Sequence, residues 1–259
     1  MRAVAELRTE HVMGMPVTID VRDVRAAAAA VDRAFAWLRW VDARFSTYRA
    51  DSDVSAINGG ALEPADAHPL VRDVLARCEE LRVRTHGYFD ARAPIPGGVD
   101  PSGLVKGWAV DRAVALLEDA GARNLCVDAG GDVAVRGEAA PGRPWRVGIR
   151  HPLEPDRLAA VVALHDGGVA TSGTYERGEH IVDPHTGAPP AGVLSVSVVG
   201  RRLATADAYA TAAFAMGEAG PAWTATLRGY GAMTVRADRR VLSTRGFRRR
   251  CGAAADLSC

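Results

Sequence analysis

Two oxygen-bearing side chains stand four residues apart in the last quarter of the sequence. Asp207 and Thr211 belong to ATADAYATAAFAMG, a segment that predicts a helix, and side chains at this spacing share one helical face. A carboxylate and a hydroxyl are hard oxygen donors of the kind that Mg²⁺ accepts beside substrate phosphates. Taken alone, the pair equally fits an aspartate that complements the helix dipole and a threonine in ordinary packing.

Lys106 is the single lysine of a chain with 31 arginines. It follows the turn 100–103 in DPSGLVKG, within the first turn of a helix that is expected to begin near Leu104. A helix N-terminus suits a phosphate and disfavours a lysine unless an anion lies there. The position therefore indicates either a chance survivor of biased composition or a need for a compact ammonium group.

The loop-rich segment TSGTYERGEHIVDPHTG gathers several groups that can take part in chemistry. His180 can act as a general base near neutral pH, or it can be an ordinary surface histidine. A triad of Ser172, His180 and Asp183 lacks support, because no GxSxG elbow is present. The glycines of DAGGDVAVRG predict a hairpin turn or a close backbone approach to a ligand. Tyr48, Tyr88 and Phe89 offer aromatic faces to a planar ligand, or serve as core residues.

The elements that must position these groups follow from apolar periodicity. A hairpin is predicted up to residue 21, and helices over 23–45, 71–87, 104–121 and 204–217. A short helical turn capped by Asp51 or Ser52 follows the first helix. Strands dominate 124–173 and 193–200, and another helix and a final strand pair close the chain. This order predicts an α+β fold in one integrated domain over residues 1–247, compact or in two lobes, followed by a disordered polar tail over 248–259.

Composition narrows the function classes. The net charge of +1 argues against nucleic acid as the main partner. Neither a bilayer-spanning apolar run nor a secretory signal is recognisable, and the four cysteines lack metal-like spacing. We therefore expect a cytoplasmic protein without stable membrane insertion.

Eight segments, taken in order, resemble the ApbE family of FAD:protein FMN transferases. They are MGM at 13–15, FSTYRADSDVSAIN at 45–58, GYFD at 87–90, DPSGLVKGWAVDRA at 100–113, DAGGDVAVRG at 128–137, WRVGIRHP at 145–152, ATSGTYERGEHIVDPHTGAP at 170–189 and ATADAYATAAFAMG at 204–217. The chain departs from the family pattern in three respects. MGM replaces the commoner MGT, Ala210 stands where some relatives have a second carboxylate, and no lipoprotein signal is visible.

The resemblance implies a T-fold-like domain with mixed sheets flanked by helices, and an FAD site built across its loops. The implied FAD contacts are Met13, Tyr48, Tyr88, Phe89, Asp90, Asp100, Lys106 and Val182. The implied Mg²⁺ ligands are the Gly103 carbonyl, Asp207 and Thr211. FAD is then the substrate, and Mg²⁺ assists the break of its phosphoanhydride.

The implied reaction moves FMN to a threonine or serine hydroxyl of an acceptor protein and releases AMP, with His180 as the candidate base. Two alternatives use the same residues. Water in place of the acceptor makes the chain an FAD pyrophosphatase that yields FMN and AMP. A chain without turnover is a module that binds or buffers FAD.

Overall fold

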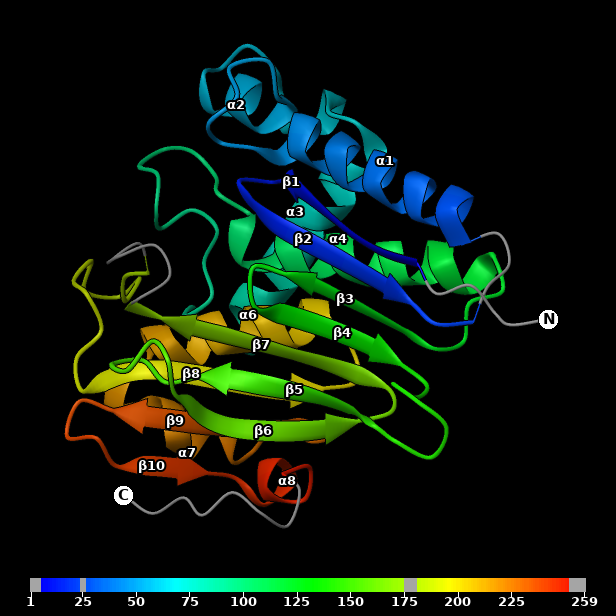
Figure 1. Cartoon of the computed structure of the whole chain (residues 1–259). Helices are drawn as coiled ribbons and strands as arrows, with labels where there is room; N and C mark the ends of the chain where they lie inside the picture. The colour runs from blue at the N-terminus through cyan, green and yellow to red at the C-terminus, as the bar shows by residue number, and fades with distance from the viewer. Residues whose placement is uncertain (1–5, 24–26, 175–180, 252–259) are drawn as a thin grey trace.

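The computed structural model describes residues 6–23, 27–174 and 181–251, and its centre is one antiparallel sheet (Figure 1). The eight strands run in the spatial order β1-β2-β3-β4-β7-β8-β9-β10. Their bounds are β1 Glu6–Val12, β2 Met15–Val21, β3 Leu125–Ala129, β4 Asp132–Arg136, β7 Gly167–Gly173, β8 Val193–Gly200, β9 Gly231–Arg236 and β10 Val241–Ser243. The expected α+β class is confirmed, and every pair of named strands in the described ranges is antiparallel rather than mixed.

Helices cover one face of this sheet and enclose the larger core. The long ones are α1 Ala27–Phe45, α3 Pro69–Arg84, α4 Ser102–Asp119 and α6 Leu203–Ala215. Shorter helices are α2 Asp53–Asn58, the 3-10 turns η1 Pro64–Asp66 and η2 Gly217–Ala219, α7 Gly220–Thr224 and α8 Arg245–Arg248. The apolar faces expected for α1, α3 and α4 are buried together in this layer, so hydrophobic burial holds the helices on the sheet.

The strands β5 Trp145–Arg150 and β6 Leu158–Leu164 leave the main sheet and pair with each other. They lie in front of it in Figure 1, on the face opposite α4 and α6. Their inward side chains meet those of β4, β7, β8, β9 and α8 in a second, smaller core. Central strands of the main sheet are therefore buried on both faces. This explains why every residue of β7 is buried and why its sequence does not alternate between apolar and polar residues.

The C-terminal region packs further than the sequence suggests. The N–H group of Ala163 donates to the carbonyl of Arg250 at 2.8 Å, and Cys251 forms a β-bridge with Val162. The described chain therefore stays against β6 through residue 251, beyond the expected start of a tail at residue 248. Within the described ranges, no helix has the length and apolar character needed to cross a bilayer.

Candidate active site

Helices α4 and α6 run antiparallel against each other, and their contact brings the expected metal ligands together. A methyl group on Gly103 would lie 3.3 Å from Thr211 Oγ1, so the backbone of α4 and the hydroxyl of α6 are in close contact. One turn further along α4, the N–H group of Gly107 donates to Asp207 Oδ2 at 3.0 Å. The contact thus places Thr211 beside Gly103 and Asp207 beside Gly107, and the role of residues 103, 207 and 211 as metal ligands stays a prediction.

The Gly107 bond also explains how a carboxylate sits in this interface. Asp207 is only 4% exposed, and a buried carboxylate needs hydrogen-bond donors. In an α-helix the N–H of residue 107 points toward the carbonyl of residue 103. The N–H that donates to Asp207 therefore lies on the side of α4 toward Gly103, one turn away. Thr211 Oγ1 in turn lies 3.4 Å from the Ser172 hydroxyl on β7.

Lys106 forms an ion pair with Asp132 at the start of β4. Its Nζ lies 2.9 Å from Asp132 Oδ2, and the lysine side chain is 18% exposed while that of the aspartate is fully buried. The other carboxylate oxygen of Asp132 accepts the N–H of Thr171 at 3.1 Å. Asp132 was not among the residues expected in the site. The only signal in the sequence is an aspartate that directly precedes the apolar run VAV, where an unpaired charge is costly.

Two tight turns lie side by side at the edge of the sheet near Asp132. Gly130 and Gly131 both have positive φ, 60° and 93°, which confirms the hairpin expected for DAGGDV. Met13 and Gly14 likewise have positive φ, 57° and 74°, in the turn that joins β1 to β2. The register of β2 and β3 pairs Val17 with Ala129 and so brings the two turns together. Met13 lies partly buried at this edge, against the main core.

The segment after α3 docks against the loop that follows β7. The rings of Tyr88 and His185 pack edge to face with centroids 4.5 Å apart. His185 Nε2 lies 3.0 Å from the carbonyl oxygen of His86. Phe89 is 3% exposed and approaches Gly103, and its N–H donates to the buried Thr85 hydroxyl at 2.9 Å. Phe89 therefore lies against Gly103 of α4, whereas Tyr88 packs on His185 of the loop after β7.

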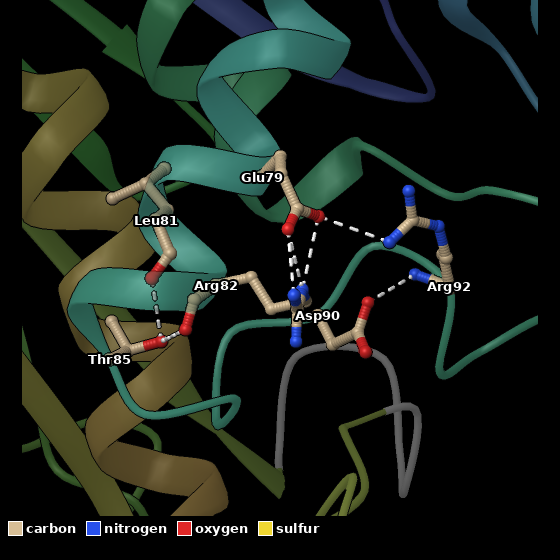
Figure 2. A network of polar contacts seen from close by, with 6 residues as sticks. All are labelled: Glu79, Leu81, Arg82, Thr85, Asp90 and Arg92. Atoms are coloured by element: carbon tan, nitrogen blue, oxygen red, sulfur yellow. Dashed lines mark hydrogen bonds and ion pairs between the residues drawn. The ribbon is translucent and has the colours of Figure 1, made fainter.

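A network on the same segment holds Asp90 (Figure 2). Arg82 binds the Glu79 carboxylate through Nε and an NH2 group, and Arg92 reaches the same carboxylate at 3.0 Å. The N–H of Arg92 also donates to Asp90 Oδ1 at 2.9 Å. The hydrogen bond from Arg82, with that from Arg92, lowers the pKa of Glu79 to about 2. The network fixes the start of the loop between Asp90 and Asp100.

The far end of that loop is held by a side-chain amide. Asn58 donates to the carbonyl of Val99 at 2.9 Å and accepts the N–H of Val99 at 2.7 Å. The N–H of Asp100 donates to the carbonyl of Ala91 at 2.6 Å and closes the loop. Asp100 Oδ1 accepts the N–H of Ser102, the first residue of α4, at 2.9 Å, and this bond orients the carboxylate.

Two expected site residues take no part in the contacts described above. Tyr48 is 89% exposed in the turn that follows α1. Val182 is partly buried in the loop after β7. His180 lies outside the described residues, so its role stays a prediction. Within the described ranges, no group of three or more His, Cys, Asp or Glu side chains is arranged to hold a metal. The Gly103, Asp207 and Thr211 set has one carboxylate and is not a group of that kind.

Fold and site together define an α+β protein whose polar centre lies where two antiparallel helices meet the sheet. The chain matches the model of the ApbE family over residues 13–94 and 96–234. An FAD:protein FMN transferase from Vibrio cholerae serotype O1 is 37% identical, over 76% of this chain and 75% of that protein. One from Treponema pallidum is 29% identical, over 93% of this chain and 87% of that protein. The ApbE protein of Thermotoga maritima superposes with a TM-score of 0.83 at 22% identity, over 95% of this chain and 99% of that one. The chain belongs to the ApbE family, as its motifs predict.

Proposed function

We propose that this chain transfers the FMN moiety of FAD to a threonine or serine hydroxyl of an acceptor protein and releases AMP. The observation that carries the proposal is the contact between α4 and α6, where Gly103, Asp207 and Thr211 meet beside Lys106. The relatives from Vibrio cholerae and Treponema pallidum bear the name of this activity. A water-mediated pyrophosphatase reaction and simple FAD binding remain the alternatives that the experiment below distinguishes.

The transfer balances as a displacement at phosphorus. The acceptor oxygen forms a bond to the phosphorus on the FMN side, the bond to the bridging oxygen breaks, and AMP leaves with that electron pair. The hydroxyl proton passes to a base, which we propose is His180 from its place in the HIVDPHTG loop and the family resemblance. FMN then remains on the acceptor as a phosphoester.

We propose Gly103, Asp207 and Thr211 as the residues that hold Mg²⁺. The donor set fits the ion, because a carbonyl, a carboxylate and a hydroxyl are the hard oxygens it prefers. When bound, Mg²⁺ supplies Lewis-acid stabilisation of the charge on the phosphoanhydride. The chain's own contribution is orientation: the Gly107 N–H holds Asp207, and Ser172 lies within 3.4 Å of Thr211.

We propose the FAD contacts that the family resemblance implies. They are Met13, Tyr48, Tyr88, Phe89, Asp90, Asp100, Lys106 and Val182. Phe89, at Gly103, and Lys106, on α4, lie next to the proposed metal ligands. Tyr88 and Asp90 belong to a segment that is pinned at both ends by the Glu79 network and by Asn58. A rigid frame of this kind lowers the entropy that is lost when a ligand binds.

The experiment incubates the purified chain with FAD, Mg²⁺ and an acceptor domain. The acceptor comes from a bacterial flavoprotein that normally carries covalent FMN, and it is prepared without the FMN. Mass spectrometry of the acceptor and chromatography of AMP are the readouts. We expect FMN on the acceptor and an equal amount of AMP, and the loss of both in Asp207→Asn. Asp119→Asn, the same change at an exposed position on α4, is the matched control and should be fully active. AMP and free FMN without acceptor labelling would make the chain a pyrophosphatase, and intact FAD would make it a binding module.

We also place the protein in the cytoplasm. Cys78, Cys126 and Cys251 are free thiols, as is usual where the compartment is reducing. Burial raises the pKa of the Cys78 and Cys126 thiols to about 12, so both stay protonated and inert. Fractionation of cells that produce the native chain tests this location.

A further inference from the structure

The contact between α4 and α6 continues one turn beyond the site, to Asp111. Its Oδ1 accepts the N–H of Leu203 at 3.1 Å, and its Oδ2 accepts the N–H of Ala204 at 3.1 Å. These are the first two N–H groups of α6, which have no partner within their own helix. The N-cap residue of α6, Arg202, makes no side-chain capping bond. The cap of α6 is therefore supplied by a side chain of α4.

The spacing of these contacts is the same on both helices. On α4 the contact residues are Gly103, Gly107 and Asp111, four apart. On α6 their partners are Thr211, Asp207 and the pair Leu203 and Ala204, taken in the opposite direction. Four residues advance an α-helix by about 6 Å. A fixed contact at one end of such an antiparallel pair therefore sets the axial position of the other two.

Close packing leaves little room for the helices to slide. A methyl group on Gly107 would lie 2.8 Å from the Cα of Ala204 and 2.8 Å from the carbonyl oxygen of Leu203, so the two backbones are in direct contact. Burial raises the pKa of Asp111, and its bonds to Ala204 and Leu203 oppose that rise. A desolvated carboxylate is costly unless its hydrogen bonds are kept, so the bonds to α6 are held firmly.

We propose that Asp111 is a positioning residue that sets the register of α6 against α4. In this role it holds Asp207 on the Gly107 N–H and Thr211 beside Gly103, although it touches neither the proposed metal ligands nor FAD. The consequence for Mg²⁺ rests on the proposed function. The consequence for the Gly107 bond is a property of the protein without ligand and can be measured by itself.

The test separates register from simple helix capping. Asp111→Ala removes the bonds to both N–H groups. Adding Arg202→Asp restores a cap within α6 itself, because residue 202 has the extended backbone that a capping side chain requires. The control is Thr244→Ala. The Thr244 hydroxyl accepts the N–H of Ala232 on β9 and the N–H of Phe247 on α8, and α8 packs on the other face of the sheet.

Three quantities are measured for each variant: the melting temperature, the ¹H–¹⁵N signal of Gly107, and the Mg²⁺ concentration that gives half-maximal transfer. We expect Asp111→Ala and Thr244→Ala both to lower the melting temperature. Only Asp111→Ala should move the Gly107 signal toward its position in Asp207→Asn, and raise the half-maximal Mg²⁺ concentration about tenfold. Adding Arg202→Asp should restore the melting temperature and leave the other two quantities shifted.

The proposal is overturned if the Gly107 signal stays at its parental position in Asp111→Ala. It is equally overturned if the added cap restores all three quantities, because Asp111 would then act only as a cap. Should Asp111→Ala fail to fold, Asp111→Asn replaces it, since the amide keeps one acceptor and loses the other. A parent protein that transfers no FMN would refute the proposed function, and the Gly107 signal would still decide the role of Asp111.

Discussion

Lys106 and Asp132 form an ion pair between the helix layer and the sheet. The ammonium group extends from α4 and the carboxylate from β4, 2.9 Å apart. The aspartate is fully buried, so its charge needs a partner inside the protein. This pairing gives a physical reason why a compact ammonium suits residue 106 better than the bulkier, planar guanidinium used everywhere else in the chain.

Removal of Asp132 should break an ion pair whose carboxylate is fully buried and whose lysine side chain is only 18% exposed. We expect Asp132→Ala to lower the free energy of unfolding by on the order of 3 kcal/mol. Adding Lys106→Met should recover part of that loss, since both charges are then gone. Urea titrations of the four proteins of this cycle measure the effect. Losses that simply add would show that the two side chains do not interact.

Glu79 should make the stability of the protein depend on acid. Its pKa falls from 4.5 to about 2 in the folded state. A lowered carboxyl pKa adds stability above the unfolded value, and that stability is lost as the pH falls through the folded one. We therefore expect Glu79→Gln to be less stable than the parent at pH 6, with the difference shrinking between pH 4.5 and 2. Urea midpoints across this range measure it, and Glu63→Gln, at an exposed site, should show no such convergence.

At the scale of elements, the sequence predicts most helices and strands and does not predict how they are arranged. The period of apolar residues places α1, α3, α4 and α6 within a few residues of their observed bounds. Ser52 caps α2 as expected. The sequence does not predict that β5 and β6 form a separate pair packed on the main sheet. Their alternating pattern fits a strand in any sheet with one exposed face.

The same distinction holds for the site. Asp207 and Thr211 are recognisable because their spacing lies within one helix. Lys106 is singled out because the sequence predicts it in the first turn of a helix, but α4 begins at Ser102, so Lys106 lies in the second turn, where the helix dipole acts more weakly. Asp132 and Asp111 are not recognisable in this way. Each acts through partners on another element, Lys106 on α4 for the one and the start of α6 for the other, and only the packed structure shows such partners.

Gly107 is required by the closeness of α4 and α6. Its backbone lies against Ala204, and α6 permits this because it is rich in alanine and buried nearly all round. We expect Gly107→Ala to destabilise the protein by about 1–3 kcal/mol, since the added methyl must push the helices apart. Chemical denaturation measures this loss, and FAD titration should show weaker binding. Gly121→Ala tests a glycine with open space around it, and its cost should come from its positive φ alone, with no change in FAD binding.

The whole molecule divides its two tasks between the faces of one sheet. The face that carries α4 and α6 holds the polar centre, whereas the face under β5 and β6 holds the second core. Asp132 on β4 and Ser172 on β7 point to the first face. Val133 and Val169, on the same two strands, pack into the second core. The sheet therefore separates the polar centre from the second core. A change in the second core can reach the site only by moving the strands between them.

This division predicts that stability and function can be separated. Phe247 on α8 is 1% exposed and packs into the second core, so Phe247→Ala should cost about 3–5 kcal/mol of unfolding free energy. At a temperature where the variant stays folded, its FAD affinity should remain within about twofold of the parent, because no strand that carries a site residue loses a backbone hydrogen bond. Urea denaturation and FAD titration measure the two quantities. Leu242→Ala, at a half-exposed position on β10, should change neither by much. A large loss of FAD affinity in folded Phe247→Ala would instead show that the second core sets the geometry of the site across the sheet.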